Sequence, residues 1–410
     1  MERKITALLL FSSLLVGNLL ARDLNTIIPG LYGRSGGGFD GEPGIRVGSV
    51  DGHEAHFNFG SAIALRSLNQ QLGGDFAVFP FNSASGTFNF AFDPDLGTFV
   101  STTDTLGPLF AERGKTIGDK TLNLAFSFTF FEYDSFNGQS LDNFHIRGIH
   151  IPTSLPPIDE INPNSFEADT VDIRLKVKAQ VKIYSLVASY GLTDSLEVGV
   201  LVPLVDVGLR VRSHWDLVVS PNNPLPGVHT TNPAQNAEPQ NDSASGTAFG
   251  LGDVVLRTKY QFVKNKPVDL SAAVLVKLPT GDENNFLGSG DATVRPLLAA
   301  SKTFSDLFGK KLSVTPHANL GFEFNLHDAN RNSTEYAVGI EGGARRLTLA
   351  VDFLGSLRND GQHRLATAVG AKWNVWKQLI VSANVILPVN DEGLRSDLIT
   401  TLGAEYSFKF

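Results

Sequence analysis

The sequence predicts an all-β fold, an up-and-down antiparallel transmembrane β-barrel of about 12–14 strands, and three observations lead to it. The chain opens with an export signal, then repeats long strands with one apolar and one polar face, and ends on an amphipathic strand whose last residue is Phe410. The composition agrees, because 40 glycines and 29 phenylalanines against one methionine favour β-structure over a helical bundle.

Residues 1–21 have the layout of a secretory signal peptide. A short basic start is followed by an almost wholly apolar run from Ile5 to Leu20, and Ala21 offers a small residue for cleavage. A buried N-terminal helix is the alternative, which Gly17 disfavours. We therefore expect the chain to be exported.

Charge and cysteine content exclude several classes of function. The net charge is −8, which argues against nucleic acid as a partner. The chain has no cysteine, and this excludes thiolate metal sites, iron–sulfur clusters and cysteine nucleophiles. After the signal no segment reaches about 18 uninterrupted apolar residues, so membrane-spanning helices are not expected. The mean hydropathy of −0.01 is what alternating strands give.

The clearest strand covers Val171–Ile183. Its odd-numbered residues are apolar and its even-numbered residues are polar, so it has two unlike faces. The same pattern recurs along the chain. We expect further strands around 122–130, 196–212, 253–262, 269–277, 312–325, 334–345, 346–357, 364–376, 377–387 and 397–410, and two weaker ones near 86–92 and 97–103.

Short and long connections alternate between these strands. The short ones are 192–195, 264–267, 345–346 and 376–377, and the long ones are 134–169, 214–247, 279–292 and 388–396. Up-and-down outer-membrane barrels have short periplasmic turns and long external loops. The alternation therefore predicts that topology.

The strand number indicates which face meets lipid. About eight strands can fill their interior with side chains, but a barrel of twelve to fourteen strands is too wide. We therefore expect the apolar face to meet lipid and the charged face to meet a wet lumen, while closure pairs every backbone group. A soluble β-sandwich also produces alternation, although strands of this length disfavour it.

The charges of the polar faces are expected to line the lumen. Basic residues fall on three consecutive strands and acidic residues on three later ones, so that opposed arcs would orient a polar or amphipathic solute. Ion pairs that merely fill the barrel are the alternative. The expected lumen residues are Arg174, Lys176, Lys178, Lys182, Arg210, Arg212, Arg257, Lys259, Glu323, Glu335, Glu341 and Asp352.

Two local features of the barrel strands stand out. Around Pro203 the apolar positions shift from even to odd numbers, as a β-bulge would produce, and proline lacks the donor that a ladder needs. At the C-terminus Tyr406, Phe408 and Phe410 share one face. This aromatic ending resembles the signal read by the outer-membrane barrel assembly machinery, which we expect as a partner.

Several stretches resemble the outer-membrane transport family labelled for the phenol meta-pathway degradation proteins, relatives of the FadL-type channels. They are Tyr190–Val200 with Leu201–Val205, Gly250–Leu256, Lys277–Asp282 and Leu287–Gly290, within roughly residues 170–410, while 78–133, including Gly107–Glu112, is similar to the N-terminal part of some relatives. The resemblance implies a transmembrane barrel for passive uptake of small hydrophobic or aromatic compounds.

Two further implications come from the FadL-type channels. They carry an N-terminal plug with an Asn-Pro-Ala motif, from which Asn25–Pro29 departs. They also have a strand irregularity that opens a lateral exit toward lipid. We place such an exit at Pro203 as a hypothesis, with a bulge that only bends the strand as the alternative.

The sequence divides into three expected parts. These are the signal peptide (1–21), an N-terminal segment (22–77) that forms a plug or a periplasmic helix, and the barrel (78–410). An amphipathic helix fits 55–72. The run Gly281–Asn285 carries oxygen ligands but no EF-hand spacing, so it predicts a turn rather than a metal site.

We therefore expect a passive outer-membrane channel without a cofactor. Its expected partners are outer-membrane lipid, lipopolysaccharide and a small hydrophobic solute. The histidines fall mostly in expected loops and no Gly-x-Ser-x-Gly elbow is near them, so enzyme activity is not expected. A structural or adhesin-like surface barrel, or a barrel hydrolase, is the alternative.

Overall fold

The structure is a computed structural model. It describes residues 23–31, 47–49, 57–58, 90–93, 98–101, 105–150, 169–221, 229–235, 237, 239–264, 267–307, 312–344, 346–376 and 378–410. The expected signal peptide lies outside the described residues, as does nearly all of the expected helix over 55–72. Among the described residues, no helix is both long enough and apolar enough to cross a membrane.

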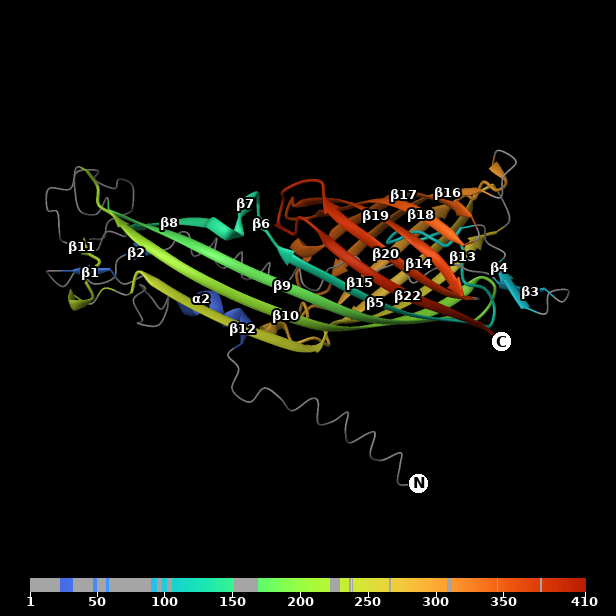
Figure 1. The fold of residues 1–410 in the computed structure, drawn as a ribbon, viewed down its shortest axis with the longest axis horizontal. Helices are drawn as coiled ribbons and strands as arrows, with labels where there is room; N and C mark the ends of the chain where they lie inside the picture. The colour runs from blue at the N-terminus through green and yellow to red at the C-terminus, as the bar shows by residue number, and fades with distance from the viewer. Residues whose placement is uncertain are drawn as a thin grey trace, which may run out of the picture.

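In the described part of the chain, twelve antiparallel strands close into a barrel (Figure 1). β22 pairs with β5, β5 with β9, β9 with β10 and β10 with β13, and the remaining neighbours follow chain order. The strands are β5 (Thr121–Tyr133), β9 (Thr170–Gly191), β10 (Leu196–Val218), β13 (Val254–Val263), β14 (Asp269–Leu278), β15 (Thr293–Ser301), β16 (Ser313–Asn325), β17 (Ser333–Ala344), β18 (Leu347–Arg358), β19 (His363–Trp376), β20 (Leu379–Pro388) and β22 (Ile399–Lys409).

The barrel turns an apolar face outward. Leucine, valine, isoleucine and phenylalanine side chains on nearly every strand are exposed there, and Trp373, Trp376 and Phe410 lie near the end that carries the short turns. An outer apolar band with aromatic residues at its edge is the pattern of a barrel that spans lipid. The expected fold is confirmed, with twelve strands. We call the two ends of the barrel the short-turn end and the long-loop end.

The two weakest expected strands are not part of the barrel. β3 (Phe90–Asp93) and β4 (Thr98–Ser101) pair only with each other, as a separate hairpin. Figure 1 shows this hairpin beyond the short-turn end, near the C-terminus. The twelve-strand alternative is therefore the correct one.

β9 and β10 continue beyond the barrel at the long-loop end (Figure 1). β5 accompanies β9 only along residues 179–190, and β13 accompanies β10 only along 196–201. Beyond these points the partners are β8 (Phe144–His150) on one side and β12 (Asn241–Leu251) on the other. We call this four-stranded sheet the extension.

The inner face of β9 and β10 changes character where the barrel ends. Within the barrel it carries Ser185, Ser189 and Glu197, whereas in the extension the same face carries Val177 and Leu209, all of them buried. The extension packs its apolar inner face into a hydrophobic cluster with the N-terminal residues. The regular alternation of Val171–Ile183 therefore comes mostly from a strand that covers a protein core, with its polar face outward.

The described N-terminal residues lie against the extension. η2 (Leu24–Thr26) and α2 (Ile27–Leu31) bury their apolar side chains on β10 and β12. The remaining short elements occupy the loops. They are β1 (Gly48–Ser49) paired with β11 (His229–Thr230), β2 (Phe57–Asn58) beside β8, the small sheet of β6 (Ser135–Phe136), β7 (Gln139–Ser140) and β21 (Leu394–Arg395), and the 3-10 turns η4 (Leu141–Asn143), η6 (Pro233–Gln235), η7 (Glu283–Asn285) and η9 (Ala329–Arg331).

A charge placed on the outward face should destabilise the barrel only at membrane depth. Leu320 lies in the middle of β16 and is 56% exposed, whereas Leu326 follows the strand at the long-loop end and is 67% exposed. We expect Leu320→Arg to lower the free energy of unfolding by about 2–4 kcal/mol. Leu326→Arg should change it by less than about 1 kcal/mol. Urea titration of the protein in liposomes measures both, and equal effects would contradict a lipid-facing surface.

Candidate functional site

An irregular segment fills the short-turn half of the barrel. Residues 105–118, which we call the inserted segment, form neither helix nor strand, and most of them are buried. Their backbone N–H groups donate to side chains on the inner wall instead of to a neighbouring strand. The wall therefore supplies the acceptors that an irregular buried backbone requires.

Asp352 on β18 is the centre of this attachment. Its Oδ2 accepts hydrogen bonds from three successive backbone N–H groups, those of Leu109 (3.1 Å), Phe110 (2.8 Å) and Ala111 (3.1 Å). Its Oδ1 lies 2.8 Å from Nε2 of His317, and both side chains are fully buried. A carboxylate that accepts several N–H bonds can remain charged in a buried place.

Gly339 makes the contact between His317 and Asp352 possible. The three residues stand in register on β16, β17 and β18, with Gly339 in the middle. A Cβ at Gly339 would come within 2.3 Å of Asp352 Oδ1 and 2.4 Å of His317 Nε2. The absence of a side chain on β17 thus lets the two polar groups meet across it.

Glu112 joins the inserted segment to β13. Its carboxylate accepts a bidentate pair from Arg257, at 2.8 and 2.7 Å, and lies 3.2 Å from Nζ of Lys259. Arg257 also donates to Glu197 on β10 at 2.6 Å. Burial raises the pKa of Glu112, but the charges of Arg257 and Lys259 outweigh this and lower the pKa to about 2. The carboxylate is therefore ionised, and the Arg257–Glu112 pair is an ion pair at the edge of the barrel interior.

The rest of the inserted segment reaches other strands. Arg113 forms a buried ion pair with Glu341 on β17, and the N–H of Gly114 donates to Ser301 on β15 at 2.9 Å. The N–H of Ile117 donates to Glu197 at 2.7 Å. Strands around much of the barrel thus hold the segment across the lumen.

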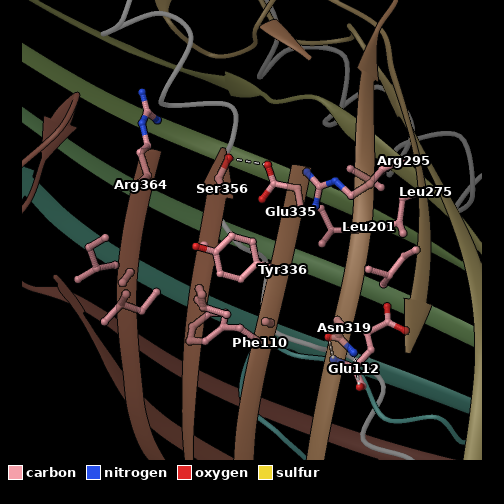
Figure 2. A pocket seen from close by; sticks show the side chains of 18 of the residues that line it. Phe110, Glu112, Leu201, Leu275, Arg295, Asn319, Glu335, Tyr336, Ser356 and Arg364 are labelled. Atoms are coloured by element: carbon pink, nitrogen blue, oxygen red, sulfur yellow. Dashed lines mark hydrogen bonds between the residues drawn. The ribbon is translucent and has the colours of Figure 1, made fainter. Parts of the chain in front are cut away.

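Above the inserted segment lies a cavity of about 330 Å³. Figure 2 shows Phe110 and Glu112 of the inserted segment on one side of it and the β-strands around it. Most of its wall is apolar, and aliphatic side chains line it, Val187 and Ile399 among them. Six others, each on a different barrel strand, also point inward. These are Leu201, Val255, Leu275, Leu297, Leu354 and Ile386, which we call the apolar belt.

Polar groups border this belt. Arg257, Arg295, Glu335, Arg364 and Arg395 also line the cavity. Glu335 accepts hydrogen bonds from Ser333 and Ser356, each at 2.6 Å. An apolar pocket with a few placed polar groups is the usual form of a small-molecule site. A cavity of about 150 Å³ suffices for benzene, so the space admits a single aromatic ring.

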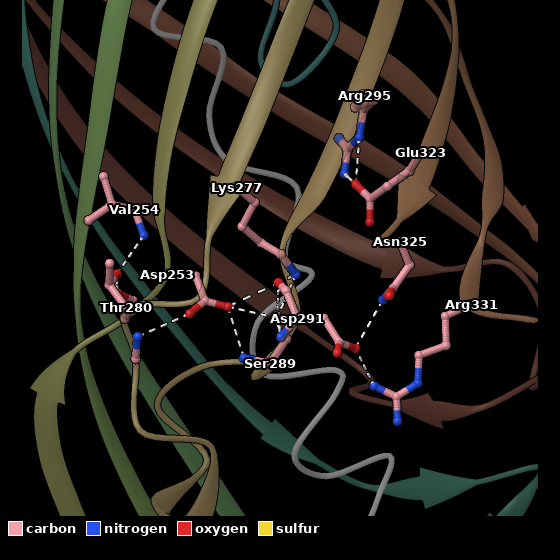
Figure 3. A network of polar contacts seen from close by, with 12 residues as sticks. Asp253, Val254, Lys277, Thr280, Ser289, Asp291, Arg295, Glu323, Asn325 and Arg331 are labelled. Atoms are coloured by element: carbon pink, nitrogen blue, oxygen red, sulfur yellow. Dashed lines mark hydrogen bonds and ion pairs between the residues drawn. The ribbon is translucent and has the colours of Figure 1, made fainter. Parts of the chain in front are cut away.

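A polar network ties the loop 279–292 to the barrel (Figure 3). Asp253 accepts from the N–H of Gly281 at 3.1 Å and from the N–H and hydroxyl of Ser289 at 2.8 Å each. Asp291 accepts from Asn325 at 2.9 Å and from Arg331 at 2.7 Å. In the same loop Asp282 caps η7 by accepting from the N–H of Asn284. The Asp-rich run thus forms a turn, as its sequence predicted.

Six of the expected lumen residues face the other way. They lie on the outer face of the extension, which is opposite the buried odd-numbered residues of β9 and β10. The interpretation as lumen residues is wrong for them, because in the extension the inner face of β9 and β10 packs against a hydrophobic core and the polar face points outward. The six are Arg174, Lys176, Lys178, Lys182, Arg210 and Arg212.

The other six point inward. Arg257 and Glu335 line the cavity, and Glu323 pairs with Arg295 on the neighbouring strand. Lys259, Glu341 and Asp352 bind the inserted segment. Most of these charges therefore hold protein groups in place inside the barrel.

Pro203 is buried in a strand that continues through it. The ladder between β9 and β10 keeps one register past Pro203, so β10 itself has no bulge. The extra residue lies in the adjacent strand, where Gly252 and Asp253 separate β12 from β13. The N–H of Gly252 donates to the carbonyl of Pro203 at 2.8 Å. The predicted phase shift thus reflects the change of environment where the barrel ends, with the irregularity one strand away.

The inserted segment was missed by periodicity. It has no alternation of apolar and polar residues, and only the family resemblance points to Gly107–Glu112. The sequence indicates it only indirectly. The stretch contains glycine, proline and adjacent charges, does not fit a strand, and lies directly before a clear strand pattern. The plug expected within residues 22–77 is not seen in the described part of that segment, since η2 and α2 lie against the extension.

The geometry defines the class of protein, a transmembrane β-barrel whose lumen holds the inserted segment. Residues 164–393 match the family described as "Putative MetA-pathway of phenol degradation". This is more than half of the chain, and the protein belongs to that family. No curated protein matches the chain.

Three solved structures resemble the chain. An outer membrane channel from Pseudomonas putida F1 has 14% identity and a TM-score of 0.41, over 72% of this chain and 97% of that one. The CymD monoaromatic hydrocarbon channel has 10% identity and a TM-score of 0.34, over 71% and 90%. The Ralstonia pickettii toluene transporter TbuX has 12% identity and a TM-score of 0.34, over 78% and 98%.

Removal of the Asp352 carboxylate should loosen the inserted segment. In Asp352→Ala three backbone N–H groups lose their acceptor, so we expect the amides of residues 109–111 to lose about 1–3 kcal/mol of protection. Hydrogen exchange read by mass spectrometry measures this. Glu335→Gln is the control, because Glu335 binds two serine hydroxyls on the wall. Unchanged exchange in Asp352→Ala would show that other contacts hold the segment.

Proposed function

We propose that this protein is a passive outer-membrane channel for small hydrophobic or aromatic compounds. The observation that carries the proposal is the apolar belt around a cavity inside a transmembrane barrel. A channel for ions or sugars needs polar groups at this height of the lumen to replace the water around the solute. An apolar wall instead favours a solute whose transfer from water costs little free energy. The family, whose description refers to phenol degradation, supports an aromatic solute.

The solute would enter from the long-loop end and reach the apolar belt. Below the belt the inserted segment closes the axial path with charged and backbone contacts. Passage straight down would require these buried contacts to break. A path that leaves the segment in place is the less costly one.

A lateral exit beside Pro203 supplies such a path in our proposal. Here two residues of β10 face three of the adjacent strand, so the ladder is interrupted for a short distance. A Cβ on Gly252 would lie 3.0 Å from Pro203 and 3.2 Å from the backbone of Leu287, so the loop 279–292 covers the place. Movement of Leu287 would uncover the irregular part of the wall. The proposal assigns Pro203 the role of keeping that wall weakly paired.

Uptake should depend on the apolar belt. Leu354→Asn places an amide among the aliphatic side chains, and we expect uptake of toluene into proteoliposomes to fall about tenfold, the equivalent of roughly 1.4 kcal/mol. Ser382→Asn on the inner face of β20 is the matched control, since Ser382 does not line the cavity. If the two variants behave alike, the belt is not the pathway.

Pro203→Val tests the exit separately. Valine restores a backbone donor on the side of the strand where the Pro203 carbonyl accepts from Gly252, and one added hydrogen bond of about 1 kcal/mol there would keep the wall closed more often. We expect toluene uptake to fall about fivefold while the barrel stays folded, as shown by its heat-dependent mobility in gels. Uptake equal to that of the wild type would remove Pro203 from the pathway and leave the channel proposal standing.

The alternatives are separable by the same assay. An adhesin-like barrel predicts no uptake of any solute, whatever its loops bind. For a hydrolase, the His317–Asp352 pair is the natural candidate within the described chain, but both side chains are fully buried beneath the inserted segment and Asp352 is engaged by three N–H groups. A substrate in the outer leaflet could not reach them. We therefore favour transport.

A further inference from the structure

The outer face of the extension carries basic residues that oppose one another across two strands. Lys178 on β9 lies directly opposite Arg210 on β10, and Lys176 lies directly opposite Arg212. Like charges in directly opposed positions destabilise a sheet. A pattern that places two such pairs side by side therefore needs an anion to offset the repulsion.

Ion pairs balance some of the charges on this face but not all of them. Lys182 pairs with Asp206 at 3.0 Å and Lys176 with Asp142 at 2.9 Å. Lys178, Arg210 and Arg212 are exposed, and no acidic side chain of the described residues forms an ion pair with them. We call these three residues the basic cluster.

Hydroxyl groups extend the basic cluster onto a third strand. Ser245 on β12 lies opposite Arg210, and Ser243 lies opposite Arg212. Both serines are exposed, as are the two arginines. Guanidinium groups bind phosphate through paired N–H donors, and serine hydroxyls add donors for phosphate or sugar oxygens. The chemistry of this surface therefore fits a phosphorylated sugar.

The position of the basic cluster along β9 matches a lipid headgroup. Toward the short-turn end the same outer face becomes apolar, beginning at Tyr184 and continuing with Leu186, which is 52% exposed. Lys182 marks the boundary, and Lys178 lies four residues beyond it. At ~3.3 Å per residue and a tilt of about 40° this is roughly 10 Å above the apolar surface.

We propose that the basic cluster binds the phosphate groups of the glycolipid that forms the outer leaflet around the barrel. Lys178, Arg210 and Arg212 neutralise the phosphates, and Ser243 and Ser245 bond to the sugar beside them. The lipid lies against the outer wall where β9 and β10 leave the membrane. This site is independent of the solute path, since it lies on the opposite face of the same two strands.

The test measures binding of bisphosphorylated lipid A to the full-length barrel in detergent by native mass spectrometry. We expect K178Q/R210Q/R212Q to bind at least about tenfold more weakly than the wild type, and binding to the wild type to weaken with salt. K120Q/R346Q/K409Q removes three exposed charges at the short-turn end and should bind as the wild type does. K178R/R210K/R212K keeps the charge but replaces two bidentate guanidinium groups with ammonium groups, so it should bind more weakly than the wild type and at least about threefold more tightly than K178Q/R210Q/R212Q.

Two further arms identify the ligand. Lipid A without phosphates should bind the wild type at least about tenfold more weakly, and inorganic phosphate at millimolar concentration should not displace the lipid. Equal binding by the wild type and K178Q/R210Q/R212Q, or no preference for phosphorylated lipid, would overturn the proposal. Displacement by inorganic phosphate alone would show a site for the free anion and overturn the lipid assignment. Heat-dependent gel mobility confirms that each variant is folded, and R210Q, with an expected loss of about threefold, replaces the triple variant if that one fails to fold.

Discussion

The requirement that every backbone N–H and C=O within a membrane find a partner determines the rest of this structure. Strands satisfy it only when the sheet closes, and here β22 meets β5 while β9 meets β10. Closure removes all edges within the membrane. It also fixes the diameter, because twelve strands enclose a lumen too wide for their own side chains to fill.

The inserted segment is the response to that width. An irregular chain inside a barrel has unpaired N–H groups, and the wall meets them with buried acceptors such as Asp352, Ser301 and Glu197. Charged residues among these acceptors need partners in turn, which explains the pairs that link Arg257 with Glu112. The short-turn half of the lumen is therefore polar and occupied by the inserted segment, and the space that stays open lies at the apolar belt above it.

Alternation along the chain predicts strands well but does not say what each face touches. Lipid and a packed protein core both select apolar side chains, so the odd-numbered residues of Val171–Ile183 fit either. Arg174 and Arg257 have the same pattern in sequence, yet one lies outside the extension and the other inside the barrel. The missing information was the height at which the wall ends, which depends on β5 stopping at Tyr133. The inserted segment escaped for a different reason, since contacts with side chains of distant strands leave no period in its own sequence.

The two faces of β9 and β10 connect these arguments. At the barrel's rim the inner face changes from polar to apolar because it passes from the lumen to the cluster around α2. The outer face changes in the opposite sense at nearly the same height, from Leu186 to Lys182, because it leaves the lipid. Both changes occur at one boundary, the upper edge of the membrane, and alternate residues of the strands record it on the two faces. The sequences of β9 and β10 therefore encode the depth at which these strands lie in the membrane. At the boundary, Pro203 lies within the wall where the solute would pass, and Lys182 lies outside it where the lipid would bind.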